Sequence, residues 1–165
     1  MRPWQERPPE AASLLNPAFC AVVLTSAVGG YVEEVQTGMP FVLPFLALPI
    51  VLHKQTRSAL PGTIRTSMPA WLESNAEARI GFAERVRAIA PYAREALLFG
   101  STRGAIGFSS TGTVVLGASQ LGIKKFARST TDETRACVEK ARFVGRWFAG
   151  GGTAQTVLAL WGVRP

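Results

Sequence analysis

The sequence contains few of the residues that enzymes use in catalysis. It has one histidine and two cysteines among 165 residues. His53 could act as a base oriented by Glu33 or Glu34, but a single histidine at the end of an apolar helix is more often structural. No serine or cysteine lies in a nucleophile elbow. We therefore expect a protein that is not an enzyme and that has no catalytic residues.

Glycine-rich nucleotide-binding motifs are also incomplete. A P-loop needs Gly-x-x-x-x-Gly-Lys-Ser/Thr, so that backbone amides and the lysine hold phosphates. Gly117 and Gly122 have the glycine spacing, but Ile123 stands at the lysine position. The glycine run 150–152 is too incomplete for a dinucleotide loop, because Gln155 replaces the third glycine, and a helix end explains it better. The sequence therefore predicts no cofactor, and we assign any ATP hydrolysis to a partner.

The two cysteines have neither the spacing nor the partner residues of a metal site. Cys20 and Cys137 lie in apolar helical patterns, which is typical of reduced core thiols in a cytoplasmic protein. The sequence leaves a disulfide between them open. The start at Met1 lacks the apolar run and the cleavage site of a secretory signal. We expect no metal site and no export.

Two long uncharged windows, 11–32 and 35–52, raise the question of a membrane span. The first contains Asn16, Pro17 and a glycine pair, and the second contains three prolines. We therefore interpret both windows as buried core and expect no membrane. A membrane-associated protein is the least favoured alternative.

Basic residues are concentrated after residue 50. The formal net charge is +7, but the first 50 residues hold two arginines against four glutamates, and the remainder holds 16 basic against seven acidic groups. A polyanion would therefore contact the later part of the chain.

Composition divides the chain into four segments. Residues 1–13 are rich in proline and charge and are expected to form an irregular arm, with Trp4 as its anchor. Residues 14–117 form the predicted core, and 118–129 form a connector that mixes glycine, serine and lysine. Residues 130–165 form a C-terminal helical segment that packs on the core.

Helix signals are clear in the first third of the chain. Asn16 followed by Pro17 predicts a helix start, because asparagine caps free amide groups and proline suits the first turn. This helix should extend to about Gln36. The prolines of the segment 39–57 exclude one long helix there, so we expect a rigid buried segment that leads into a short basic helix over about 49–60.

A second short helix over 69–73, capped by Thr66 or Ser67, is expected next. A longer helical pattern then starts at Asn75, and we expect Pro91 to break it into two pieces.

Two strands, 104–108 and 113–116, are predicted to form a hairpin after these helices. Short helices followed by a hairpin are the outline of a winged helix. The predicted fold class is therefore mostly α with a small β-hairpin (α+β), a winged-helix-like core with an additional C-terminal helix pair.

The C-terminal segment begins with a capping box of Thr130 and Glu133, which predicts a helix to about residue 149. One face of that helix is apolar, with Cys137, Ala141, Val144 and Phe148, and another is basic, with Arg135, Glu139, Arg142 and Arg146. Thr153 is expected to cap a last short helix, with Gly162 as its left-handed C-terminal cap. A strand over 156–161 is the alternative.

Four basic residues are candidates for nucleic-acid contact. A winged-helix protein would use Lys54, Arg57 and Arg65 in the two-helix region and Arg103 near the hairpin against DNA phosphates and grooves. The alternative is that these charges are solvated, face a protein partner or pair with acidic residues.

The candidate partner interface combines aromatic and basic residues near the ends of the chain. Trp147 lies on neither the apolar nor the basic stripe of its helix, so we expect it to be exposed and to anchor a partner, as Trp4 would in the N-terminal arm. Arg135, Arg142 and Arg146 complete this candidate surface.

Several blocks of the sequence, taken in order, carry a family resemblance. They are Leu-Asn-Pro-Ala-Phe-Cys at 15–20, the proline-punctuated run at 39–57, Phe-Val-Gly-Arg-Trp-Phe-Ala at 143–149 and Trp-Gly-Val-Arg-Pro at 161–165. Together they resemble the middle component of bacterial ABC-three-component systems, of which Lamassu-type phage defence is the best-known example. The resemblance spans nearly the whole chain and includes no catalytic signature.

The resemblance implies a small non-enzymatic adaptor subunit, encoded between an SMC- or Rad50-like ABC ATPase and an effector such as a nuclease or toxin. Such a subunit would couple the two in an anti-phage or anti-plasmid defence complex, with weak or only indirect contact to DNA. The alternative is a stand-alone winged-helix transcriptional regulator, which would bind DNA as a symmetric dimer. An adaptor should instead need co-expression with its partners.

Overall fold

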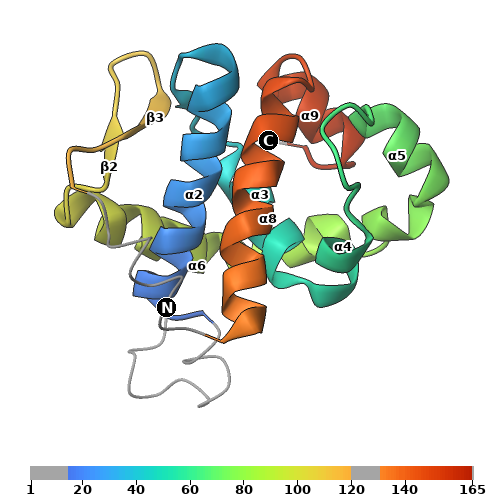
Figure 1. Cartoon of the computed structure of the whole chain (residues 1–165), viewed down its shortest axis with the longest axis horizontal. Helices are drawn as coiled ribbons and strands as arrows, with labels where there is room; N and C mark the ends of the chain where they lie inside the picture. Colours follow the sequence, from blue (N-terminus) through green and yellow to red (C-terminus); the bar gives the residue numbers. More distant parts are fainter. Residues whose placement is uncertain (1–14, 120–130, 165) are drawn as a thin grey trace.

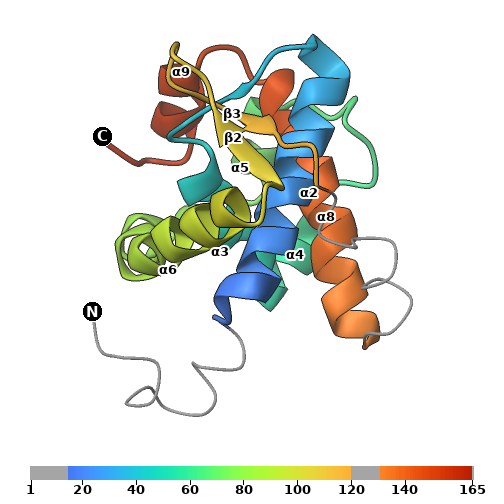
Figure 2. The same ribbon diagram turned by 90° about the vertical axis from the view of Figure 1, so that its left-hand side faces the viewer.

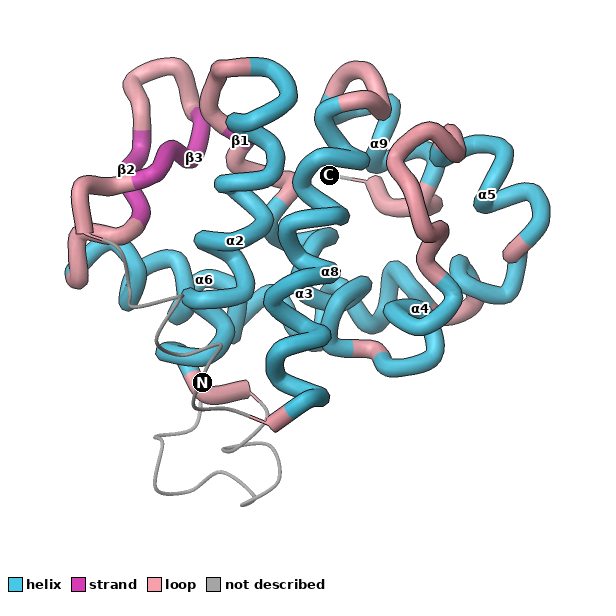
Figure 3. The backbone as a smooth tube through the Cα atoms, viewed as in Figure 1, coloured by secondary structure: helices cyan, strands magenta, loops and turns pink. Residues whose placement is uncertain are grey.

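The computed structural model describes residues 15–119 and 131–164. It is mostly helical with a small antiparallel sheet, as the sequence predicted, and Figure 3 shows that the strands are confined to one end of the molecule. The helices, in chain order, are α2 (Pro17–Val35), α3 (Pro44–Leu52), α4 (Lys54–Ala59), α5 (Met68–Ser74), a 3₁₀ helix (Ala76–Arg79), α6 (Phe82–Thr102), α8 (Asp132–Ala149) and α9 (Ala154–Leu160).

Helix α2 begins and ends where the sequence predicted. The Asn16 side chain accepts a hydrogen bond of 2.8 Å from the Ala18 amide, and Gln36 ends the helix with a left-handed φ of 57°. By length and composition α2 could cross a membrane, but 56% of its most apolar window is buried inside the protein. It therefore has the burial of a core helix, and Figure 1 shows it running beside α8 through the centre of the fold.

Two glycines allow α2 and α8 to pack closely. A Cβ at Gly30 would overlap the backbone of Arg142, and a Cβ at Gly145 would overlap the backbone of Ala27. The Ser26 hydroxyl also donates a hydrogen bond of 2.8 Å to the Val138 carbonyl oxygen of α8. We call this contact between the two helices the α2–α8 seam.

The proline-punctuated segment differs in detail from the prediction. Helix α3 starts at Pro44 and includes Pro49, whereas the expected helix over 49–60 is divided at His53, whose backbone is extended. Nearly all of α3 is buried, which is consistent with the predicted rigid core segment. The His53 side chain caps the separate helix α4.

The predicted break at Pro91 is wrong, because α6 continues through it from Phe82 to Thr102. Buried side chains on both sides of the proline, including Val86, Ala93 and Leu97, hold the two halves of α6 on the same core. Their burial outweighs a proline penalty of about 3 kcal/mol. Helix α6 packs against α2 and α3, on the side of α2 away from α8 (Figure 2).

The predicted hairpin is present as β2 (Ile106–Phe108) and β3 (Thr113–Leu116). The sheet also includes β1 (Met39–Pro40), which the sequence did not predict; the order is β1-β3-β2, with Met39 opposite Val114. The winged-helix detail is not confirmed, because the hairpin lies at the opposite end of the molecule from α4 and α5 (Figure 1).

The C-terminal helices follow the prediction with one change. Thr131 caps α8 by accepting from the Thr134 amide, whereas Thr130 lies outside the described residues. Helix α9 confirms the predicted last helix, and the alternative strand is wrong. Gly162 has a φ of +67°, and the Val163 amide donates back to the Leu158 carbonyl oxygen at 2.9 Å, which completes the predicted C-terminal cap.

Candidate partner interface

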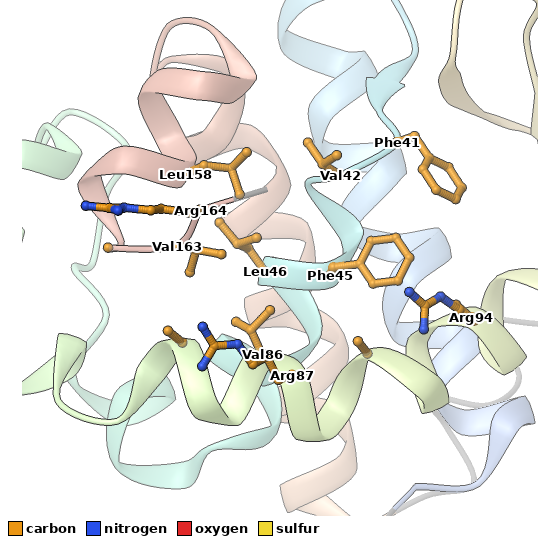
Figure 4. Close-up of a pocket in the computed structure, with 13 residues that line it drawn as sticks. Phe41, Val42, Phe45, Leu46, Val86, Arg87, Arg94, Leu158, Val163 and Arg164 are labelled. Atoms are coloured by element: carbon orange, nitrogen blue, oxygen red, sulfur yellow. The ribbon is translucent and has the colours of Figure 1, made fainter. Parts of the chain in front are cut away.

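An apolar groove of about 660 Å³ lies between α3, α6 and the end of the chain after α9 (Figure 4). Side chains from these three elements converge on it, including Leu46, Val86 and Val163. We call this cavity the α6 groove. It is lined by Phe41, Val42, Phe45, Leu46, Ala83, Val86, Arg87, Ala90, Arg94, Leu158, Gly162, Val163 and Arg164.

One stripe of α6 forms a side of this groove. Ala83, Val86, Ala90 and Arg94 recur at intervals of three or four residues, which places them on one helix face. Ala90 is small, so a partner could approach the α6 backbone closely between Val86 and Arg94. The stripe therefore forms a shallow apolar track along the helix.

Aromatic side chains extend the apolar surface beyond the groove. Phe41 is 43% exposed, and its ring lies edge-on to Phe45 at 5.5 Å and to Phe108 of the hairpin at 6.0 Å between centroids. Phe108 is itself 49% exposed. We call Phe41 and Phe108 the aromatic ridge. Exposed apolar surface that continues over several elements is typical of a protein interaction site.

The charged residues that line the groove are all arginines. Arg87, Arg94 and Arg164 are present, and none of the described residues that line it is acidic. Arg94 stacks on Phe45 with its guanidinium carbon 5.8 Å from the ring centroid, and Arg87 lies 3.8 Å from Glu84 in an exposed pair. An exposed pair of this kind contributes little, so both arginines can bind a carboxylate from outside.

Trp147, the predicted interface anchor, does not lie on the surface. It is 2% exposed, its indole nitrogen donates to the Thr66 carbonyl oxygen at 2.8 Å, and its ring packs edge-on against Trp71. The expectation that it is exposed is wrong, because α5 and the loop before it cover this side of α8. The helical pattern of α8 alone could not show that a second buried face exists.

The basic face of α8 is largely paired within the chain. Arg142 Nε donates to Glu33 at 3.1 Å and Arg146 Nε donates to Glu34 at 2.6 Å, both glutamates being on α2. Arg135 Nη1 donates to Asp132 at 2.9 Å.

None of the three arginines of the α8 basic face lines the α6 groove. Trp4 lies outside the described residues. The described candidate interface residues, Trp147 and the three arginines, are therefore not brought together with the groove.

The nucleic-acid candidates are also separated. Arg57 is 4% exposed; it donates to the Val51 carbonyl oxygen at 2.6 Å and forms an ion pair with Glu133, so its predicted phosphate contact is wrong. Lys54 and Arg65 are exposed.

Arg103 is exposed beside the Phe99 ring, where α6 ends and the chain enters the hairpin, and the hairpin lies at the opposite end of the molecule from α4 and α5 (Figure 1). The four cations therefore do not form one DNA-binding surface.

The remaining titratable candidates have structural roles. His53 Nδ1 lies 2.7 Å from the Thr56 hydroxyl, and burial, together with nearby Arg85 and Arg57, lowers its pKa. A group of three histidine, cysteine, aspartate or glutamate side chains that could hold a metal is not found within 15–119 and 131–164.

Cys20 and Cys137 are buried free thiols, and burial raises the pKa of Cys20 to about 12. The disulfide that the sequence left open is not formed.

Comparison with known proteins gives one result that covers nearly the whole chain. A family model described as "ABC-three component (ABC-3C) system Middle Component 3" matches residues 4–165. The chain belongs to this family. No curated protein and no solved structure matches it. The family resemblance of the sequence blocks is thereby confirmed.

For this middle component, the sequence did not identify the α6 groove. Its residues come from positions 41–46, 83–94 and 158–164. Each stretch, taken by itself, has the residue pattern of ordinary core or of a helix surface. One signal was present: Ala83, Ala90 and the arginines at 87 and 94 form an α6 face with few large apolar groups but no acidic residue. Helical periodicity could place these residues together, but only the fold shows that α3 and the chain end face them.

Proposed function

We propose that this middle component is a non-enzymatic adaptor that couples an SMC- or Rad50-like ABC ATPase to an effector protein, a nuclease or toxin. It acts in the cytoplasm, in an anti-phage or anti-plasmid defence complex. The observation that carries the proposal is the family match over residues 4–165, since a middle component of a three-component system implies partner proteins.

The surface of the protein supports an adaptor role. The α6 groove and the aromatic ridge combine exposed aromatic side chains with arginines, which are the residue types enriched in protein interfaces. The histidine and the two cysteines are instead committed to the fold: His53 caps α4, and both thiols lie in the core. The described surface therefore offers better chemistry for binding proteins than for catalysis.

An adaptor acts through the difference between its contacts in two states. In the resting complex it holds the effector against the ATPase, and when the ATPase detects invading DNA the effector is rearranged or released. A ligand or nucleotide can shift this equilibrium only by binding the two states with different affinity. Exposed Lys54 and Arg65 remain candidates for weak contact with DNA phosphates, and DNA is sensed mainly by the ATPase.

Co-purification tests the proposal. The tagged chain is expressed from its native gene neighbourhood, and the proteins that elute with it at moderate salt are identified by mass spectrometry. We expect stoichiometric recovery of an ABC ATPase and an effector. Recovery of a bare homodimer with DNA would contradict the adaptor role and favour the transcriptional regulator instead.

A further inference from the structure

We propose that the α6 groove binds an acidic amphipathic helix of another subunit of the three-component system. This inference rests on the proposed adaptor function and names the partner chemistry that the groove recognises. Three features carry it: the length of the α6 stripe, the three arginines in a lining whose described residues include no acidic one, and the aromatic ridge that continues from the groove.

The groove has the length of a short helix. The α6 stripe extends from Ala83 to Arg94, which at 1.5 Å per residue is about 16 Å, or about three helical turns. Leu46 and Val163 face the stripe from α3 and from the chain end (Figure 4). A partner helix with apolar side chains at intervals of three and four residues would place one side chain per turn between these elements.

The charged residues that line the groove determine the sign of the charge that a partner must carry. Arg164 and Arg94 lie toward opposite ends of the groove, with Arg87 between them (Figure 4). Arginine binds carboxylates through two parallel hydrogen bonds, and stacking of Arg94 on Phe45 leaves the edge of its guanidinium available for such a pair. The matching helix therefore carries aspartate or glutamate beside its apolar stripe.

The surface around the groove favours a protein segment over a small molecule. A small apolar ligand would fill the cavity and leave Phe108, which does not line it, exposed, whereas a helix that continues past the groove would cover both Phe41 and Phe108. A second copy of this chain fits poorly, because a two-fold dimer through this surface would place one arginine-lined groove against another. An acidic helix of another subunit satisfies both the apolar surface and the charge.

The test replaces two exposed arginines of the groove in the full complex. The double variant Arg87→Glu with Arg94→Glu reverses charge on the outer side of α6 and leaves the core unchanged. A matched control, Arg79→Glu with Arg103→Glu, changes the net charge equally at exposed positions outside the groove. Each chain is co-expressed with the other two proteins of its locus, and affinity is measured by titrating the purified subunit that binds. Thermal unfolding verifies that both variants fold.

We expect the groove variant to lose about 100-fold in affinity for one partner subunit, about tenfold per arginine, and the control to change by less than about threefold. A photo-reactive residue at position 90 should cross-link to a partner segment that has carboxylates three or four residues apart.

Different failures have different meanings. If the wild-type chain recovers no partner, the proposed function is overturned and this inference with it. If the complex forms but keeps its affinity in the Arg87→Glu, Arg94→Glu variant, only the inference is overturned. Cross-linking to a second copy of the chain or to a basic segment would also overturn it.

Discussion

The α2–α8 seam and the α6 groove both combine arginines with apolar helix surface, but they differ in where the opposite charges come from. At the seam, Arg142 and Arg146 pair with Glu33 and Glu34 of the same chain, and glycines bring the two backbones together. The groove is lined by three arginines and, among the described residues, no acidic one, and the one ion pair at its edge, Arg87 with Glu84 at 3.8 Å, is long and exposed. A basic surface therefore indicates a partner only where the fold itself does not supply the compensating charge.

The seam should be the more sensitive of the two regions to added volume. Gly145→Ala places a methyl group on the Ala27 carbonyl oxygen, so we expect a loss of about 3 kcal/mol in the free energy of unfolding, measured by urea denaturation. Gly29→Ala is the matched control on α2, because a Cβ there meets no atom within 4 Å. It should be neutral or stabilise by up to about 1 kcal/mol, because alanine favours helix over glycine. Equal effects of the two substitutions would show that the helices are not closely packed.

The buried Arg57 sharpens the distinction between structural and partner-facing arginines. We expect Arg57→Leu to cost about 2 kcal/mol, because it removes the donor to the buried Val51 carbonyl oxygen and the partner of Glu133. Glu133→Gln should cost less than about 1 kcal/mol, since the glutamate side chain is mostly exposed. Chemical denaturation at neutral pH measures both. Wild-type stability in Arg57→Leu would show that Arg57 is free to bind a ligand.

Because the thiols of α2 and α8 are buried, we expect the protein to lose stability at high pH. Burial raises the pKa of Cys20 from 9.0 to about 12, so the folded state keeps the neutral thiol. The contribution of this thiol to the free energy of unfolding is fully present below pH 9, where the thiol is protonated in both the folded and the unfolded state. It is lost as the pH rises toward 12, by at most about 1.4 kcal/mol per pH unit.

Urea denaturation at several pH values above 9 should therefore show a steeper loss for the wild type than for Cys20→Ala. Parallel slopes would mean that the thiol is exposed to solvent.

The exposed ion pairs of the seam should give the smallest effect. Arg146→Gln is expected to reduce stability by less than about 1 kcal/mol at low salt, and the difference from wild type should shrink as salt is raised. Thermal unfolding at two ionic strengths measures it. A large loss of stability that does not depend on salt would show that Arg146 and Glu34 interact as a buried ion pair does. That result would weaken the comparison with the groove.

The sequence predicted elements whose signals are local. Asn16 and Pro17 located the start of α2, the strand pattern located the hairpin, and Thr153 and Gly162 bounded α9. Capping and turn preferences depend on a few neighbouring residues, so they can be identified without the fold.

The sequence could not show the features that depend on contacts between distant segments of the chain. Pro91 stays within α6 because buried residues on both sides share one core, and Trp147 is buried because α5 covers it. Arg57 is buried against the Val51 carbonyl oxygen, and its ion-pair partner Glu133 lies 76 positions later in the chain. The α6 groove was missed for the same reason, since its residues belong to three separate stretches of the chain.

Hydrogen–deuterium exchange of the free chain and of the purified complex tests the central claim most directly. We predict slower exchange on assembly in α6 over 83–94 and in the segments 41–46 and 158–164, with little change along the basic face of α8. Slower exchange along Arg135, Arg142 and Arg146, with the groove unchanged, would contradict the account and return the interface to the face that the sequence first indicated.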